Sequence, residues 1–178
     1  MKEKFQDEEI PDLEQEKRQQ TGKVSSNSLN SSNKEHILKY EMLSNVFNES
    51  RCYWTSRIKI HSDNFKCIEK ITELQAELFS DRQIILEQKH KLYERISKMN
   101  NSLHKNKKDL YLFYYSHYEI RLGSKEKEMF MDADLANKLE LNELIDNHIN
   151  FLDQTIKTLD NMIYGIKYRV SMYEMMQK

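Results

Sequence analysis

The fold is decided by residues 145–173, which read IDNHINFLDQTIKTLDNMIYGIKYRVSMY. Apolar side chains recur there in alternating steps of four and three residues, which places them on one face of an α-helix. The positions in this row are Ile145, Ile149, Leu152, Ile156, Leu159, Ile163, Ile166, Val170 and Tyr173. The pattern predicts an amphipathic helix over roughly 125–177 that pairs with other helices as a coiled coil.

This predicted helix carries more apolar surface than one neighbouring helix covers. Beyond the row lie seven further large apolar side chains, namely Phe151, Met162, Tyr164, Tyr168, Met172, Met175 and Met176. A seam between two helices needs a narrower stripe. We therefore expect a further chain, either a second copy or a different coiled-coil subunit, to cover the surplus.

A second helical pattern precedes this one, because residues 34–122 contain neither glycine nor proline. Ser32 and Glu35 have the spacing of a capping box, which predicts a helix start near residue 34. Apolar residues then recur at heptad spacing, most regularly at Ile71, Leu78, Ile85 and Leu92. We predict one long coiled-coil helix over residues 34–122, continuous through Ser80 and through Asn100-Asn101.

The reversal between the two helices is predicted at Leu122-Gly123-Ser124. A glycine can end a helix in the left-handed conformation, and a serine can cap the next helix. A link this short joins two long helices as an antiparallel hairpin, so the predicted class is all-α. A continuous rod through Gly123 is the alternative, and we disfavour it because Gly-Ser combines a stop signal with a start signal.

Charge supports the hairpin weakly. Residues 34–123 carry 16 basic and 12 acidic side chains (+4), whereas residues 124–178 carry 7 basic and 10 acidic ones (−3). Arms of opposite charge favour lying side by side, although solvent screens most of the effect.

Residues 1–33 look like a separate segment. They hold the single proline, Pro11, and a polar run TGKVSSNSLNSSN over 21–33. Such a composition buries too little apolar surface to offset the entropy of ordering. We thus predict a disordered polar arm over 1–33, a long helix over 34–122 and a fold-back helix over 124–178.

Helix lengths predict an overhang at the start of the first helix. At 1.5 Å per residue the first helix would span about 130 Å and the second about 80 Å. After folding back, residues 34–68 would have no partner within the chain. They nevertheless contain Phe47, Trp54 and Ile58. We expect this overhang to dock on another chain.

The segment 104–118, HKNKKDLYLFYYSHY, combines lysines with aromatic residues. Core packing under the hairpin tip is the simplest interpretation. A partner-binding surface formed by Tyr111, Tyr114, Tyr115 and Tyr118 is the second, because tyrosine is enriched in interfaces. Contact with nucleic acid is the third, and it is disfavoured because three lysines make a weak phosphate-binding stripe.

The sequence offers no cluster of reactive groups, so we expect no enzyme, no metal site and no cofactor. The histidines lack the three- or four-residue spacing of a metal site on a helix. His61 and His117 fall at heptad positions and are interpreted as hydrogen-bonded seam histidines. Asn106 also falls at a heptad position, where it would either select the helix register or be exposed near the tip.

Cys52 and Cys67 are 15 residues apart, about 22 Å on a continuous helix, so we expect free, buried thiols in a reducing compartment. The sequence has no signal peptide and no apolar run long enough to span a membrane, which predicts an intracellular protein. Nucleus and cytoplasm are not distinguished.

Together these features predict a structural or adaptor subunit of a hetero-oligomeric coiled-coil complex, of kinetochore, spindle, meiotic-chromosome or vesicle-tethering type. One alternative is a homo-oligomeric helical bundle that contacts a membrane surface or the cytoskeleton peripherally. The other is a nucleic-acid-binding accessory factor that uses residues 104–118.

Overall fold

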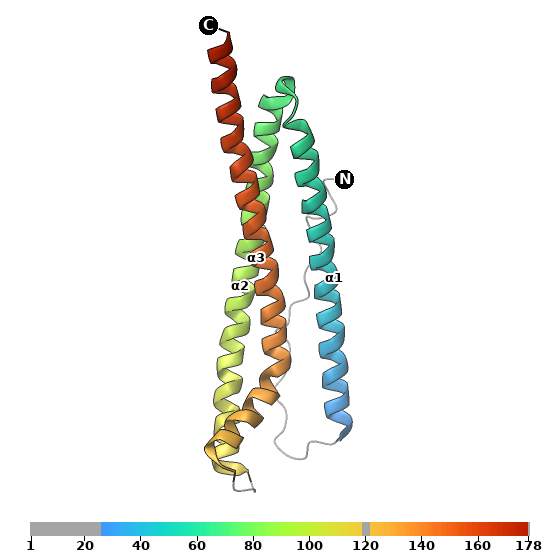
Figure 1. Cartoon of the computed structure of the whole chain (residues 1–178). Coiled ribbons are helices and arrows are strands. Elements are labelled where there is room, and N and C mark those ends of the chain that lie inside the picture. Colours follow the sequence, from blue (N-terminus) through green and yellow to red (C-terminus); the bar gives the residue numbers. More distant parts are fainter. Residues whose placement is uncertain (1–25, 119–121, 178) are drawn as a thin grey trace. The chain divides into compact units, whose positions relative to one another are not determined.

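The computed structural model describes residues 26–118 and 122–177, and this part of the chain is built from helices (Figure 1). Its elements are α1 (Ser26–Asn64), the short 3-10 helix η1 (Ile68–Lys70), α2 (Ile71–Leu112), the π-helix η2 (Phe113–His117) and α3 (Ser124–Met176). The predicted all-α class is confirmed. Of the predicted disordered arm, residues 1–25 lie outside the described residues, and residues 26–33 belong to α1.

The chain divides into two units, residues 1–35 and 36–178. The packing described below lies within the second unit.

Helices α2 and α3 form the predicted antiparallel hairpin, in one constant register. Arg82 Nε donates to Asp160 Oδ1 at 2.8 Å. One heptad further along α2, Lys89 pairs with Asp153. Further still, Asn142 Nδ2 donates to Asn100 Oδ1 at 2.8 Å. Each step forward along α2 is matched by an equal step backward along α3. Helix α2 is continuous through Ser80 and Asn100-Asn101, as predicted.

The prediction of a single helix over residues 34–122 is wrong, because α1 ends at Asn64 and the chain turns there. Phe65 N still donates to His61 O at 2.8 Å, but Lys66 and Cys67 donate only three residues back. Cys67 is then extended, with φ −99° and ψ 119°. From α3, Arg169 donates a hydrogen bond to the Phe65 carbonyl oxygen, which the helix end leaves unsatisfied.

The predicted overhang does have a partner within the chain, so that prediction is also wrong. Helix α1 folds back and lies along the α2–α3 hairpin, parallel to α3 (Figure 1). The Phe47 ring stacks on His148 at 4.2 Å between ring centroids, and Phe65 packs against Gly165. Leu43, Phe47 and Trp54 are buried in the common core.

The first long helix ends differently from the prediction. Helix α2 passes into the π-helix η2, and Tyr118 is already extended, with φ −79° and ψ 124°. Gly123 does not cap that helix in the left-handed conformation. It is the extended residue before α3, with φ −67° and ψ 160°. Its N–H donates to Glu126 Oε2 at 2.8 Å, which satisfies a donor at the start of α3.

Candidate functional site

Most of the predicted partner-binding seam is occupied by the chain's own packing. The buried members are Ile71, Leu78, Ile85, Leu92, Ile145, Ile149, Leu152, Ile156, Leu159, Ile163 and Ile166. In the predicted overhang, Phe47 and Trp54 are buried and Ile58 packs against the same core. Val170 is 41% exposed, because it lies close to the end of α3. The surface that a partner can reach is therefore made by other side chains.

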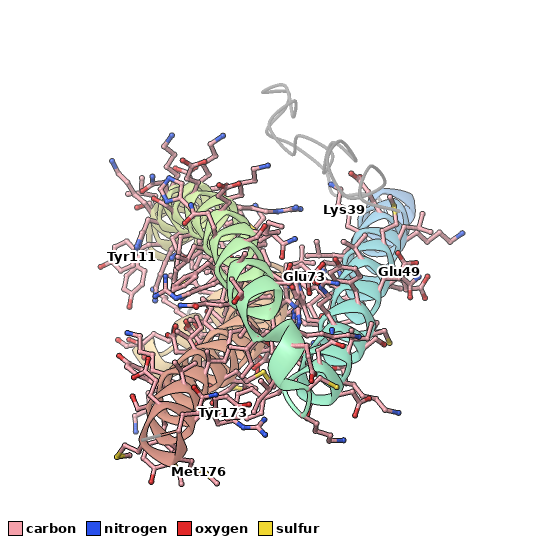
Figure 2. The ribbon with its side chains drawn as sticks, turned by 90° about the horizontal axis from the view of Figure 1, so that it is seen from above. Lys39, Glu49, Glu73, Tyr111, Tyr173 and Met176 are labelled. Atoms are coloured by element: carbon pink, nitrogen blue, oxygen red, sulfur yellow. The ribbon has the colours of Figure 1, made fainter. Side chains whose placement is uncertain are left out.

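The uncovered apolar surface gathers at the C-terminal end of α3. Tyr164 and Tyr168 are 68% and 69% exposed, and Met172 and Met175 follow on the same face of the helix. We call these four residues the C-terminal stripe. Figure 1 shows α3 extending past the connection between α1 and α2, and Figure 2, which looks onto this end, places Met176 at the outer edge of α3, away from α1. No helix within the described residues covers this stripe.

A buried polar cluster joins α1 to α2. His61 Nε2 and Arg57 Nε both donate to Asp81 Oδ2, at 2.6 and 2.7 Å. Burial of the Asp81 carboxyl is the largest single effect and raises its pKa, but the two hydrogen bonds and the nearby charges outweigh it and lower the pKa. His61 is thus a buried, hydrogen-bonded histidine, as the sequence predicted. The side chain of His117 lies outside the described residues.

A second buried histidine lies between α1 and α3. His148 stacks on Phe47 with an interplanar angle of 11°, and its Nδ1 has no hydrogen-bond partner in the described part of the chain. Burial, together with the smaller effect of the positive charge of Arg51, lowers the pKa of His148 to about 4. Arg51 itself lies over the Phe151 ring, 5.9 Å from its centroid. This histidine is neutral and serves packing.

The aromatic residues at the hairpin tip are divided between core and surface. Tyr114 is buried and donates to Asp134 Oδ2 at 2.8 Å. Burial and this hydrogen bond raise the pKa of Tyr114 to about 12. Tyr111 and Tyr115 are exposed and stack at 4.1 Å, whereas Tyr118 is half-buried and tilts against Tyr114. Core packing therefore explains part of this segment, and the exposed pair is available to a partner.

The cysteines, Asn106 and the possible metal ligands considered in the sequence form no further site. Cys52 and Cys67 are free, as predicted, but both are exposed rather than buried. Asn106 is half-exposed, and the pair of asparagines that joins the helices is Asn100 with Asn142. Within residues 26–118 and 122–177, no group of three or more histidine, cysteine or acidic side chains could hold a metal ion.

The packing role of one glycine was not predicted from the sequence. Gly165 lies in the middle of α3, and a Cβ atom there would come within 2.9 Å of Cζ of Phe65. A lone glycine inside an apolar helical pattern is the available signal for such a close approach.

No helix among the described residues is both long and apolar enough to cross a lipid bilayer. Comparison of the chain with protein-family models, with curated proteins and with solved structures found no match, so its own residues carry the functional argument.

Proposed function

We propose that this chain is a non-enzymatic structural or adaptor subunit, which binds helices of other protein chains in a hetero-oligomeric complex. Assemblies of the kinetochore, spindle, meiotic-chromosome or vesicle-tethering type use small helical subunits in this way. The alternative that the same surfaces support is a homo-oligomeric bundle, in which a second copy takes the partner's place.

The observation that supports the proposal is the C-terminal stripe. Its tyrosines present large rings, and its methionines present flexible, polarisable side chains that adapt to an apolar partner. Isolated exposed apolar residues are ordinary, but four on successive turns of one helix mark an interaction surface. A partner helix laid along them would bury the stripe in the same manner as α1 buries the opposite side of the core.

The test uses variants of exposed residues, because charged replacements at the buried Ile156 and Ile163 would unfold the core itself. Tyr164→Ser, Tyr168→Ser and Met172→Ser are combined in the full-length chain and compared with the wild type by affinity purification and mass spectrometry. We expect the co-purifying proteins to fall about tenfold or more, since three interface side chains are truncated.

The matched control truncates Tyr93→Ser, Met129→Ser and Leu139→Ser, which are also exposed. This control should keep its partners. Light scattering on the purified chain separates the alternatives: a defined oligomer that the stripe variant dissociates supports the homo-oligomeric bundle. A chain that is monomeric at high concentration and retains no partner through the stripe would overturn the proposal.

A further inference from the structure

One row of side chains on α2 faces α1. Asp81 accepts hydrogen bonds from α1, and Gln88, one heptad later, accepts one from Trp54 Nε1 at 3.3 Å. Arg95 is one heptad further along and belongs to the same row. Its pKa is lowered by burial, and its buried Nη1 finds no hydrogen-bond partner among the described residues. A half-buried guanidinium on the α1 side of α2 therefore has an unused donor.

Three residues beyond each member of this row lies a second row, at the outer edge of the same side of α2. It consists of Ile84, Lys91 and Lys98, and Lys105 continues it one heptad later; all four side chains are exposed. No ion pair involves these three lysines within the described residues. Figure 2 shows nitrogen-tipped side chains standing out from the C-terminal half of α2.

Helix α1 supplies the facing wall. Arg57 points to α2, and Ile60 lies three residues beyond it, on the outer side. Val46, Tyr53 and Ile60 form a row at heptad spacing, and each is between 41% and 49% exposed. The hydrogen bonds from Trp54 to Gln88 and from His61 to Asp81 place this row level with α2 residues 82–96. Lys91 therefore lies beside the row and Lys98 just past Val46. Lys105 is about 14 Å further along α2 than the level of Val46, so a docking helix must extend past Val46 to reach it. The two outer rows thus lie on either side of the line along which α1 meets α2, and we call the surface between these rows the α1–α2 groove.

The two walls differ in chemistry. One wall is apolar, and the other is basic, with Arg95 between them carrying an unused donor. Of the acidic residues nearby, Glu77 lies one heptad before Ile84 and pairs with Arg57 at 3.5 Å. Glu94 pairs with His90 at 3.2 Å, and Glu49 and Glu87 are exposed on the outer sides of α1 and α2. The apolar row from Val46 to Ile60 spans about 21 Å, which is four turns of a docking helix.

We propose that the α1–α2 groove binds an acidic amphipathic helix of a partner protein. Apolar side chains of that helix pack on Val46, Tyr53 and Ile60, and its carboxylates pair with Lys91, Lys98 and Lys105 and reach the Arg95 guanidinium. The proposal rests on the proposed adaptor function and names the chemistry of a partner at a second surface, separate from the C-terminal stripe.

The probe is a fluorescent synthetic helical peptide of roughly 18 residues, with leucine on one face and glutamate flanking it. Its anisotropy is titrated with the full-length chain. Replacing Lys91→Glu, Lys98→Glu and Lys105→Glu together should weaken binding about tenfold or more, because three attractions become repulsions. Added salt should weaken wild-type binding, and a peptide with glutamine in place of glutamate should bind poorly.

The matched control reverses three exposed lysines of α3, Lys125→Glu, Lys138→Glu and Lys157→Glu, and circular dichroism checks that both variants stay helical. Equal affinity of the α2 variant and the wild type, or an equal loss in the α3 control, would overturn the proposal. So would a wild-type dimer that the α2 variant dissociates, because a second copy would then occupy the groove. The C-terminal stripe variant should still bind the peptide, which keeps this test separate from that of the proposed function.

Discussion

At the scale of single residues, the contact between Phe65 and Gly165 shows how a missing side chain brings two helices together. The ring packs directly on the α3 backbone, and the Arg169 guanidinium lies over it, 5.1 Å from the ring centroid. The same arginine donates to the Phe65 carbonyl oxygen. The end of α1 therefore packs on Gly165, a residue that stands out in the apolar pattern of α3 only because it has no side chain.

We expect Gly165→Ala to lower the free energy of unfolding by about 1 kcal/mol, because the new methyl group overpacks the Phe65 ring. In a Phe65→Ala background the same change should raise that free energy by about 0.5–1 kcal/mol, since alanine is the better helix former. Urea denaturation of the four chains, followed by circular dichroism, measures this sign reversal. If Gly165→Ala changed the free energy of unfolding in the same direction with and without the Phe65 ring, the close contact between Phe65 and Gly165 would be contradicted.

His148 makes stability depend on pH. Its pKa is lowered from 6.5 to about 4. Between these two pH values the imidazole is therefore protonated in the unfolded chain and neutral in the folded chain. The stabilisation is fully present above pH 6.5 and is lost as the pH falls towards 4. The free energy of unfolding falls by about 3 kcal/mol over this range if the pKa of His148 in the unfolded chain is its ordinary value.

Replacing His148→Phe should flatten the dependence of the urea midpoint on pH between 7 and 4.5, because the titrating group is removed while the stack on Phe47 is kept. His90→Gln changes an exposed histidine and serves as the control, with a pH dependence like that of the wild type. If the urea midpoint of the His148 variant depended on pH as steeply as that of the wild type, the His148 imidazole would not be the cause of the pH dependence.

At the scale of elements, three polar pairs fix how α2 lies on α3. Arg82 with Asp160, Lys89 with Asp153 and Asn100 with Asn142 are satisfied together in one register only. Sliding one helix by a heptad would still set Arg82 against Asp153 and Lys89 against Asp146. It would, however, separate Asn142 from Asn100 and set Asn100 against Leu135, so the asparagine pair distinguishes this register from the neighbouring one. Arg82 and Lys89 are charged residues within the heptad pattern of α2, and their acidic partners are 78 and 64 residues away along the chain.

We expect Arg82→Asp alone to destabilise the hairpin by about 0.5–1 kcal/mol, because it places two carboxylates side by side at a partly exposed site. Adding Asp160→Arg should restore most of the loss by re-forming the pair in the opposite sense. Thermal and urea denaturation at low and high salt measure both effects. A double variant as unstable as the sum of its single variants would contradict a direct pair.

The turn between α1 and α2 could not be predicted from local sequence. Phe65, Lys66 and Cys67 include no glycine or proline, and the heptad pattern continues through them. What ends α1 is tertiary: Gly165 and Arg169, about a hundred residues later, hold Phe65. The hairpin and the continuity of α2 were predictable, because both rest on periodicity, which is a local property.

At the scale of the whole molecule, the sequence predicted that the chain carries more apolar surface than one pair of helices covers. In the structure only part of that surplus is covered: Phe151 and Met162 pack against the core that α1 shares, and the exposed remainder includes the C-terminal stripe and the outer row of α1. Amphipathic patterns identify which residues are apolar, but they do not say which helix lies against them. The residues of the C-terminal stripe could thus be named from the sequence as surplus apolar residues, whereas the packing of α1 beside Phe151 and Met162 could not be predicted.

The parallel packing of α1 on α3 has a consequence during synthesis. His36 meets Asn137 across 101 residues, and Arg169 meets Phe65 across 104. At roughly 5–20 residues per second, the ribosome completes α3 about 5–20 s after α1 has emerged. For that interval Phe47 and Trp54 have no α3 against which to fold, so the nascent chain carries these large apolar side chains without their final packing.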